Sequence, residues 1–314
     1  MYGHGRKKTP RLAYRIFATP SERLIFTILF LFEKPREKSM DKLPFYKMSG
    51  AGNDFIVIDN RNHILEEPAM ENFIIKVCAR KMSAGADGLI LVENSETADF
   101  KWRFFNSDGK PADMCGNGAR CAARFAYENK IAGKTLSFET AAGLVEAEIS
   151  KTLVKLKMPD PGPPLFDAPL QTDDWAMMYD FIDTGVPHAI IRVEDIESVD
   201  VTGIGRKIRF HEAFAPKGTN VNFISYEGDG DVSMRTYERG VEDETLACGT
   251  GAIASALVKS HKTGQNSPIR VIARSGSVLT IHFKREENRF YDIVMEGDAR
   301  IVYAGVLWEE AWRY

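Results

Sequence analysis

The chain has 314 residues, enough for about two domains, and its 41 basic and 44 acidic side chains give a net charge of −3. Charges of both signs are mixed along it, which excludes the polybasic patterns typical of nucleic-acid binding and of docking to an anionic membrane. Its four cysteines (Cys78, Cys115, Cys121 and Cys248) are scattered and form no C-x-x-C pair. We therefore expect a cytoplasmic protein with neither a disulfide framework nor a metal site.

Residues 1–39 differ from the remainder. A basic opening is followed by an apolar run at 24–32 and a charged stretch at 33–38. The apolar run is well short of the roughly 20 residues that span a bilayer, and no small-x-small cleavage site follows it. We expect a poorly ordered extension, with Met40 as the true start.

The next segment, 40–158, reads as one α/β domain. Apolar runs bounded by turn residues predict strands, and apolar residues at helical spacing predict helices. Across the turn at 141–143, two of the strands are expected to form a hairpin. In chain order we expect strands at 55–59, 89–92, 100–105, 136–140, 144–149 and 153–158, and helices at 71–81 and 119–129.

A proline-rich segment at 159–164 then marks a domain boundary, because four prolines in six residues exclude regular structure. The second domain is predicted at 159–296, and the C-terminal segment 297–314 is expected to return to the first domain as a strand. Here we expect a helix at 252–261 and strands at 189–193, 220–225, 232–237, 271–273, 277–284, 291–296 and 299–307.

One five-residue phrase occurs twice, as CGNGA at 115–119 and as CGTGA at 248–252. Each copy opens a predicted helix, where unpaired N–H groups and the helix dipole make an anion site. A cysteine at such a position is expected to have a pKa below its usual value. Asp87 precedes the first copy and Asn220 the second by the same 28 residues, so two related halves are indicated.

The motifs resemble those of the diaminopimelate epimerases, amino-acid epimerases that work without pyridoxal phosphate. The similarity covers residues 43 to about 305. In the first half the matching stretches are KMSGAGNDF at 47–55, FNSDG at 105–109 and MCGNGARC at 114–121. In the second half they are GVPH at 185–188, Asn220, YERG at 237–240 and ACGTG at 247–251.

This resemblance implies a fold of two pseudo-symmetric α/β domains, each a β-sheet wrapped around a central helix, with the active site in the cleft between them. It also implies a homodimer that needs no cofactor and converts LL-diaminopimelate to the meso form for lysine and peptidoglycan precursors. Cys115 and Cys248 would be the two bases, with thiol pKa values modulated by His188 and Glu238. The implied substrate-binding residues are Asn53, Asn106, Gly116, Asn117, Asn220, Glu238, Arg239, Gly249 and Thr250.

Two positions depart from the family pattern. Val186 stands where members often carry Asn, and Gly88 stands where some carry Gln. Both departures concern contacts to the distal end of the substrate, and neither concerns the thiols.

Two thiols suit this chemistry, because inverting a stereocentre requires a base on one face and an acid on the other. The N–H groups of two helix N-termini would stabilise the enolate-like charge on the carboxylate. Proline racemases and hydroxyproline epimerases share the two-thiol plan but typically have His where this chain has Asn117. Phenazine-type isomerases usually lack the cysteine pair. A non-catalytic amino-acid-binding module with inert cysteines is the alternative from another class.

Overall fold

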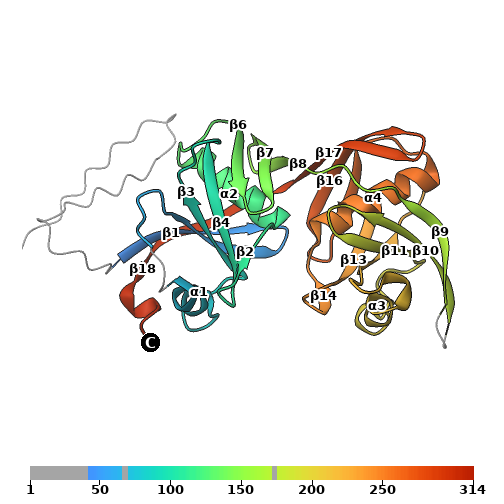
Figure 1. Cartoon of the computed structure of the whole chain (residues 1–314), viewed down its shortest axis with the longest axis horizontal. Helices are drawn as coiled ribbons and strands as arrows, with labels where there is room; N and C mark the ends of the chain where they lie inside the picture. Colours follow the sequence, from blue (N-terminus) through green and yellow to red (C-terminus); the bar gives the residue numbers. More distant parts are fainter. Residues whose placement is uncertain (1–41, 66–69, 172–174) are drawn as a thin grey trace, which may run out of the picture. The chain divides into compact units, whose positions relative to one another are not determined.

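The computed structural model describes residues 42–65, 70–171 and 175–314 (Figure 1). The predicted extension at 1–39 lies outside this part of the chain. The described strands join into one continuous mixed sheet of 18 strands. The predicted α/β class is confirmed.

The first half places its strands around a central helix, α2. The elements are β1 (Lys42–Gly50), β2 (Asn53–Asp59), α1 (Met70–Cys78), β3 (Gly88–Glu93), β4 (Phe100–Asn106), β5 (Pro111–Ala112), α2 (Gly116–Glu128), β6 (Thr135–Thr140), β7 (Gly143–Ser150) and β8 (Leu153–Lys157). Within this half the strands lie in the order β1-β2-β3-β4-β6-β7-β8. The pairs β2–β3 and β4–β6 are parallel, and the other four neighbouring pairs are antiparallel. The helix α2 packs against strands on several sides.

The second half repeats this plan around α4. Its elements are β9 (Leu165–Gln171), β10 (Ala176–Asp183), β11 (Pro187–Arg192), α3 (Val201–Arg209), η1 (Glu212–Phe214), β12 (Asn220–Ser225), β13 (Val232–Glu238), β14 (Asp243–Thr245), α4 (Gly249–Thr263), β15 (Ile269–Ile272), β16 (Val278–Glu286) and β17 (Arg289–Asp298). The pairings of β10, β11, β12, β13, β15, β16 and β17 follow the same order of directions as in the first half. The parallel pairs β2–β3 and β11–β12 are each connected through a helix, α1 and α3.

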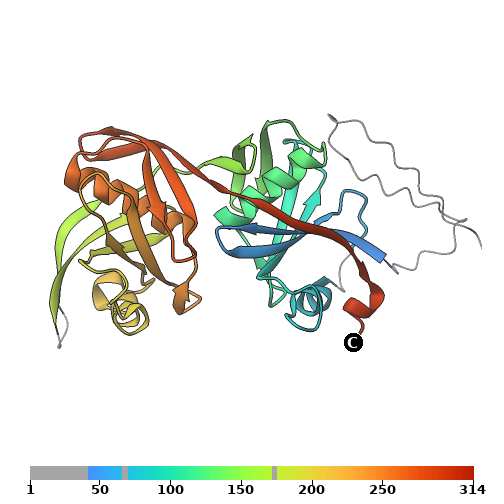
Figure 2. The same cartoon turned by 180° about the vertical axis from the view of Figure 1, so that it is seen from behind.

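Two connections join the halves. After β8 the chain forms β9, which pairs with β10, and after β17 it forms β18 (Arg300–Trp308), which pairs with β1. Figure 2 lets the reader follow β18 along β1. The strands β8 and β17, which precede these two connections, pair with each other antiparallel. A final short helix, η2 (Glu309–Ala311), follows β18.

Small residues explain how the central helices are enclosed. Ala252, Ala254 and Ala256 of α4 are fully buried, so strands can approach this helix closely on several sides. One hydrophobic core contains the buried faces of both α2 and α4. Two further cores lie under α1 and under α3.

The predicted strands and the three predicted helices are all found, with shifted ends. The helices of the two phrases begin earlier than predicted, at Gly116 and Gly249, because each cysteine is the N-cap and the glycines form the first turn. The helix predicted at 71–81 ends at Cys78.

Sequence analysis did not predict α3, because this helix contains two glycines, which are unfavourable in a helix. Asp200 caps this helix by accepting from the Gly203 N–H at 2.9 Å. A Cβ at Gly205 would lie 2.6 Å from the Cβ of Tyr237, so glycine is needed for α3 to pack on β13. The strands β1, β5, β9, β10 and β14 were also not predicted.

Candidate functional site

The first candidate base, Cys115, caps α2 in extended conformation, with φ −147° and ψ 113°. The N–H of Gly118 donates to its Sγ at 3.5 Å, and the N–H of Ala119 donates to its carbonyl oxygen at 2.8 Å. The first turn of α2 is closely packed at its two glycines. A Cβ at Gly116 would lie 2.9 Å from Cε of Met295, and one at Gly118 would touch Trp102.

A buried arginine orders this first turn. Arg120 is fully buried, and its guanidinium donates to Asn117 Oδ1 at 2.8 Å and to the Asp298 carbonyl oxygen at 3.1 Å. The Asn117 amide group in turn donates to Asn53 Oδ1 at 2.5 Å. Both functional ends of the Asn117 side chain are therefore engaged, and its backbone is held at the helix start.

Asn53 belongs to a polar cluster at the start of β2. Its Nδ2 donates to Asp87 Oδ2 at 3.2 Å, and the Asp54 N–H donates to the same carboxylate at 3.1 Å. Lys47 and Arg80 pair with Asp54 at 2.8 and 2.5 Å, and these bonds lower the pKa of Asp54 to about 2 against the opposing effect of burial. The structure thus brings predicted residues Asn53 and Asn117 together.

Asn106 lies close to this cluster, because the next residue, Ser107, donates its N–H to the Asp87 carbonyl oxygen at 3.1 Å. It is exposed at the end of β4, in register with Gly88 on β3. A Cβ at Gly88 would lie 2.6 Å from the Phe105 carbonyl oxygen, so this position has no room for a larger residue.

The second candidate base, Cys248, caps α4 with φ −123° and ψ 110° and is 7% exposed. Its Sγ lies 3.5 Å from Oγ1 of Thr250. A Cβ at Gly249 would lie 3.0 Å from Sδ of Met295. Met295 therefore lies against the first turns of both α2 and α4.

The predicted lowering of the thiol pKa values is wrong for this structure. Burial raises the pKa of Cys115, although the N–H groups of Gly118 and Asn117 and the charge of Arg120 act in the opposite direction. Burial raises the pKa of Cys248 to about 12; the charges of Glu238 and Cys115 add to this rise. Removing the thiolate from water therefore outweighs the helix N-terminus here.

His188 contacts the second site through Thr250. Its Nε2 lies 2.9 Å from Thr250 Oγ1, and its Nδ1 lies 2.9 Å from Nδ2 of Asn222. Burial, with a contribution from the Arg239 charge, lowers the pKa of His188 to about 3, so the imidazole is neutral. Sequence analysis missed Asn222. The available signal was a second asparagine, two positions after Asn220 in a predicted strand that is otherwise largely apolar.

Asn220, Glu238 and Arg239 lie beside one another on β12 and at the end of β13. The Asn220 side chain accepts from the Arg239 N–H at 2.8 Å and donates to the Pro187 carbonyl oxygen at 3.1 Å. Burial raises the pKa of Glu238. The carboxylate of Glu238 acts on both thiols, since its charge raises the pKa of Cys115 as well as that of Cys248.

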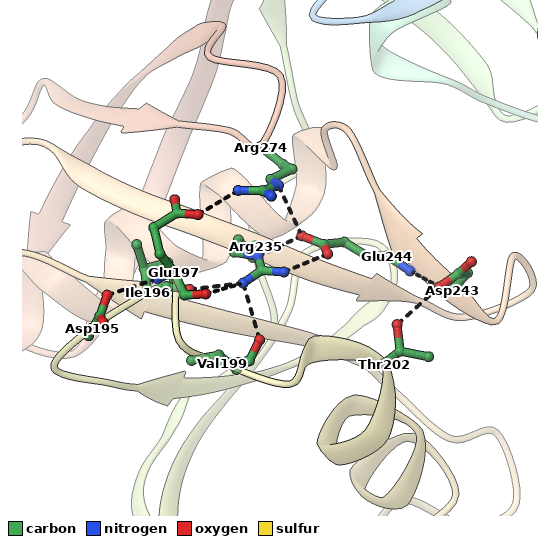
Figure 3. A network of polar contacts seen from close by, with 9 residues as sticks. All are labelled: Asp195, Ile196, Glu197, Val199, Thr202, Arg235, Asp243, Glu244 and Arg274. Carbon is green, nitrogen blue, oxygen red and sulfur yellow. Dashed lines mark hydrogen bonds and ion pairs between the residues drawn. The ribbon is translucent and has the colours of Figure 1, made fainter.

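An ion-pair network braces the hairpin that presents Glu238 and Arg239. Arg235 of β13 donates two hydrogen bonds of 2.7 Å to the carboxylate of Glu244 on β14 (Figure 3). It also donates to the backbone carbonyl oxygens of Ile196 and Val199. Arg274 joins the network through Glu197 at 2.7 Å. The hairpin leads directly to Cys248, so this network supports the second site.

Within 42–65, 70–171 and 175–314, no group of three or more His, Cys, Asp or Glu side chains is placed to hold a metal ion. The same described residues include no helix that is long and apolar enough to cross a membrane.

Comparison with known proteins gives a consistent result. The family model described as diaminopimelate epimerase matches residues 45–161 and 181–302. The chain is 47% identical to the diaminopimelate epimerase of Aquifex aeolicus (strain VF5), over 87% of this chain and 100% of that protein. It is 44% identical to the diaminopimelate epimerase of Chlorobaculum tepidum, over 83% of this chain and 99% of the relative.

Solved structures share the fold at low sequence identity. A phenazine biosynthesis protein of the PhzF family from Bacillus anthracis has a TM-score of 0.65 at 16% identity, covering 85% of this chain and 99% of its own. A hydroxyproline epimerase from Agrobacterium vitis, with bound trans-4-hydroxy-L-proline, has a TM-score of 0.62 at 17% identity, covering 86% and 94%. These likenesses concern the fold alone.

Proposed function

The chain belongs to the diaminopimelate epimerase family, and we propose that it converts LL-diaminopimelate to meso-diaminopimelate by a two-base mechanism without a cofactor. This reaction serves lysine and peptidoglycan precursor biosynthesis. One observation carries the proposal for this chain. Cys115 and Cys248 each cap a helix, and the first turns of both helices contact the same side chain, Met295.

In this mechanism one sulfur removes the α-proton as a thiolate, and the other delivers a proton to the opposite face as a thiol. The backbone N–H groups at Gly116-Asn117 and Gly249-Thr250 bind the α-carboxylate and stabilise the enolate-like charge that develops on it. The remaining proposed substrate contacts come from Asn53, Asn106, Asn220, Glu238 and Arg239.

Because burial raises the pKa of both thiols, we infer that the base is generated on substrate binding. The charge of Glu238 is one cause of the raised pKa of both thiols. When the α-ammonium group of the substrate pairs with Glu238, it offsets that charge and lowers the thiol pKa. Glu238 thereby both binds the substrate and couples binding to formation of the thiolate, while His188 acts on Cys248 through Thr250.

A hydroxyproline epimerase or proline racemase is the enzyme alternative. The side chain of Asn117, which occupies the position of the typical His in those enzymes, is held by Arg120 and Asn53. That arrangement, together with the curated relatives, favours diaminopimelate. A non-catalytic amino-acid-binding module is disfavoured by the same relatives.

We also propose a cytoplasmic homodimer, with domains at 40–158 and 159–296 and the return segment 297–314. The pairing of β18 with β1 supports assigning the return segment to the first domain. All four cysteines are free, which supports the cytoplasmic location. For the dimer the support is β18, whose exposed apolar side chains are Val302, Tyr303, Val306 and Trp308.

The test is incubation of the purified protein with LL-diaminopimelate in deuterated water. At early times we expect meso product that carries deuterium at the inverted carbon, while remaining substrate carries none, because the two faces exchange with different sulfurs. Chiral chromatography with mass spectrometry measures both. L-proline and trans-4-hydroxy-L-proline serve as parallel substrates, and turnover of these instead of diaminopimelate would establish the alternative.

A further inference from the structure

We propose that Asn222 is a positioning residue for Cys248: it fixes the tautomer of His188, which in turn directs the hydroxyl proton of Thr250 at the Cys248 sulfur. The inference deepens the proposed function, because it rests on Cys248 acting as one of the two bases. It concerns a chain of four side chains from three elements, β12, β11 and the start of α4.

The orientation of the Asn222 amide is set by its other neighbours. Its Nδ2 donates to the backbone carbonyl oxygen of Ala189 at 3.3 Å, and a carbonyl oxygen can only accept. Its Oδ1 accepts from the Thr236 hydroxyl at 2.9 Å. Asn222 is fully buried, so water cannot replace these partners. The NH₂ group must therefore face the Nδ1 of His188.

This orientation determines where His188 carries its proton. An amide NH₂ donates and cannot accept, so the Nδ1 of His188, 2.9 Å away, must be the unprotonated nitrogen. His188 is fully buried and neutral, with a pKa of about 3. Its single ring proton consequently lies on Nε2 and is donated to Thr250 Oγ1 at 2.9 Å.

The Thr250 hydroxyl completes the chain. Because its oxygen accepts from His188, its own proton is available to the Cys248 sulfur at 3.5 Å. A hydroxyl donor stabilises a thiolate more than a thiol, and the hydrogen bond from Thr250 indeed acts to lower the pKa of Cys248. The other groups acting on this chain are Glu238, Cys115 and the Gly251 N–H on Cys248, and Arg239 on His188.

The glycine that follows Thr250 provides the space that this chain of side chains needs. A Cβ at Gly251 would lie 2.3 Å from Oδ1 of Asn222. At the corresponding Gly118, the nearest atoms belong to the apolar side chains of Trp102, Ile90 and Phe55. The same glycine in the two phrases thus accommodates a polar amide in one half and an apolar wall in the other.

The experiment measures the tautomer and the thiol separately from turnover. Two-dimensional ¹⁵N NMR of histidine-labelled protein distinguishes a proton on Nε2 from one on Nδ1, and His188→Gln assigns the signal. We expect the Nε2–H form in the wild type and a mixture in Asn222→Leu. A wild-type signal from the Nδ1–H form would overturn the proposal.

Alkylation of Cys248, followed by peptide mapping, provides the second readout, with Cys115 in the same sample as internal reference. Losing the hydroxyl donor lowers the thiolate fraction about tenfold, and the greater nucleophilicity of a more basic thiol offsets part of this. We expect Asn222→Leu and Thr250→Val each to slow Cys248 alkylation about threefold. Thr250→Ser should restore the wild-type rate.

A double-variant cycle decides whether Asn222 acts through Thr250. In the Thr250→Val background, Asn222→Leu should have no further effect on Cys248. An equal slowing in both backgrounds would show that Asn222 acts by packing alone. Asn60→Leu, which removes another buried amide in the first half, is the matched control and should leave Cys248 unaffected.

If Asn222→Leu does not fold, Thr236→Val removes the partner of Oδ1 and should give the same change in tautomer to a smaller extent. None of these readouts uses epimerisation. If the protein passes these tests but does not turn over diaminopimelate, the proposed function is refuted, while the hydrogen-bond chain from Asn222 to Cys248 still stands.

Discussion

The two cysteine-led helix starts have the same backbone plan and different electrostatic surroundings. Cys115 is stabilised as a thiolate by the N–H groups of Gly118 and Asn117 and by the charge of Arg120. Cys248 is stabilised by the Thr250 hydroxyl and the Gly251 N–H, and opposed most strongly, after burial, by Glu238. The repeated phrase therefore specifies the turn and the cap, whereas the third residue and its partners decide the surroundings of each sulfur.

The third residue of each phrase shows how the halves have diverged. Asn117 is held by a buried cation, Arg120, and by an amide from β2. Thr250 is held by a neutral imidazole, His188, from β11. One thiol is thus supported by a fixed charge and the other by an oriented hydroxyl, so perturbations of the two sites should have different signatures.

The largest effect is expected from removing either sulfur. Cys115→Ala and Cys248→Ala should each lower epimerisation at least about 10³-fold, because one face of the α-carbon then lacks its proton donor or acceptor. Circular dichroism and turnover measure fold and activity. Cys78→Ala and Cys121→Ala are the matched controls and should stay near wild type, since Cys78 is the last residue of α1 and Cys121 lies inside α2, and neither caps a helix start. Normal turnover in either of the first two variants would refute the two-base assignment.

Oxidation tests whether the two sulfurs face each other. Cys115 is near enough to Cys248 for its charge to raise the pKa of that thiol. Mild oxidant should link the two as a disulfide, provided that their Cα atoms approach to within about 7 Å. Activity should be lost and then recovered with a thiol reductant, and substrate should protect. Inactivation without a linked peptide in the mass map would argue against facing thiols.

The fixed charge of the first half can be removed by Arg120→Met. This change leaves Asn117 Oδ1 and the Asp298 carbonyl oxygen without their buried donor, so we expect a loss of about 2–4 kcal/mol in the free energy of unfolding. Urea denaturation measures it. The exposed Arg206→Met on α3 is the control and should change stability by less than about 0.5 kcal/mol. Equal losses would mean that burial of Arg120 has no special role.

The neutral imidazole of the second half predicts a pH dependence. The pKa of His188 is about 3 when folded and 6.5 in its unperturbed state. Between these values only the unfolded chain binds the proton, so stability falls as pH is lowered below about 6.5, by about 1.4 kcal/mol per pH unit at most. Urea midpoints between pH 7 and 5 measure this slope. His188→Gln should flatten it, and an unchanged slope would show that His188 is charged in the folded protein.

The smallest effect concerns Val186, one of the two positions that depart from the expected family pattern. Val186→Asn should lower KM for diaminopimelate about threefold with kcat unchanged, through one added hydrogen bond to the substrate. Steady-state kinetics measure the change. Gly88→Gln is the contrasting variant. Its side chain would collide with Phe104 and Phe105, so it should reduce stability instead. An unaltered KM in Val186→Asn would place that side chain away from the substrate.

Local sequence was sufficient to predict much of the framework. Apolar runs and turn residues located the strands, and the two Cys-Gly phrases predicted both central helices, because capping and period depend on neighbours in the chain. These local signals did not predict α3, because Gly205 is unfavourable in an isolated helix. Only the close contact with Tyr237 explains why glycine stands there. The motifs likewise pointed to Cys115 and Cys248 as candidate bases, and their position as N-cap residues is a local feature of the sequence.

Tertiary structure alone decided the electrostatics of the site. The helix N-terminus predicts a lowered thiol pKa, but burial raises the pKa of both thiols, and burial depends on residues far apart in the sequence. The same holds for Asn222, Thr236 and Arg120. Their roles come from hydrogen bonds across strands and helices, and a polar residue in an apolar run does not reveal its partner until the chain is folded.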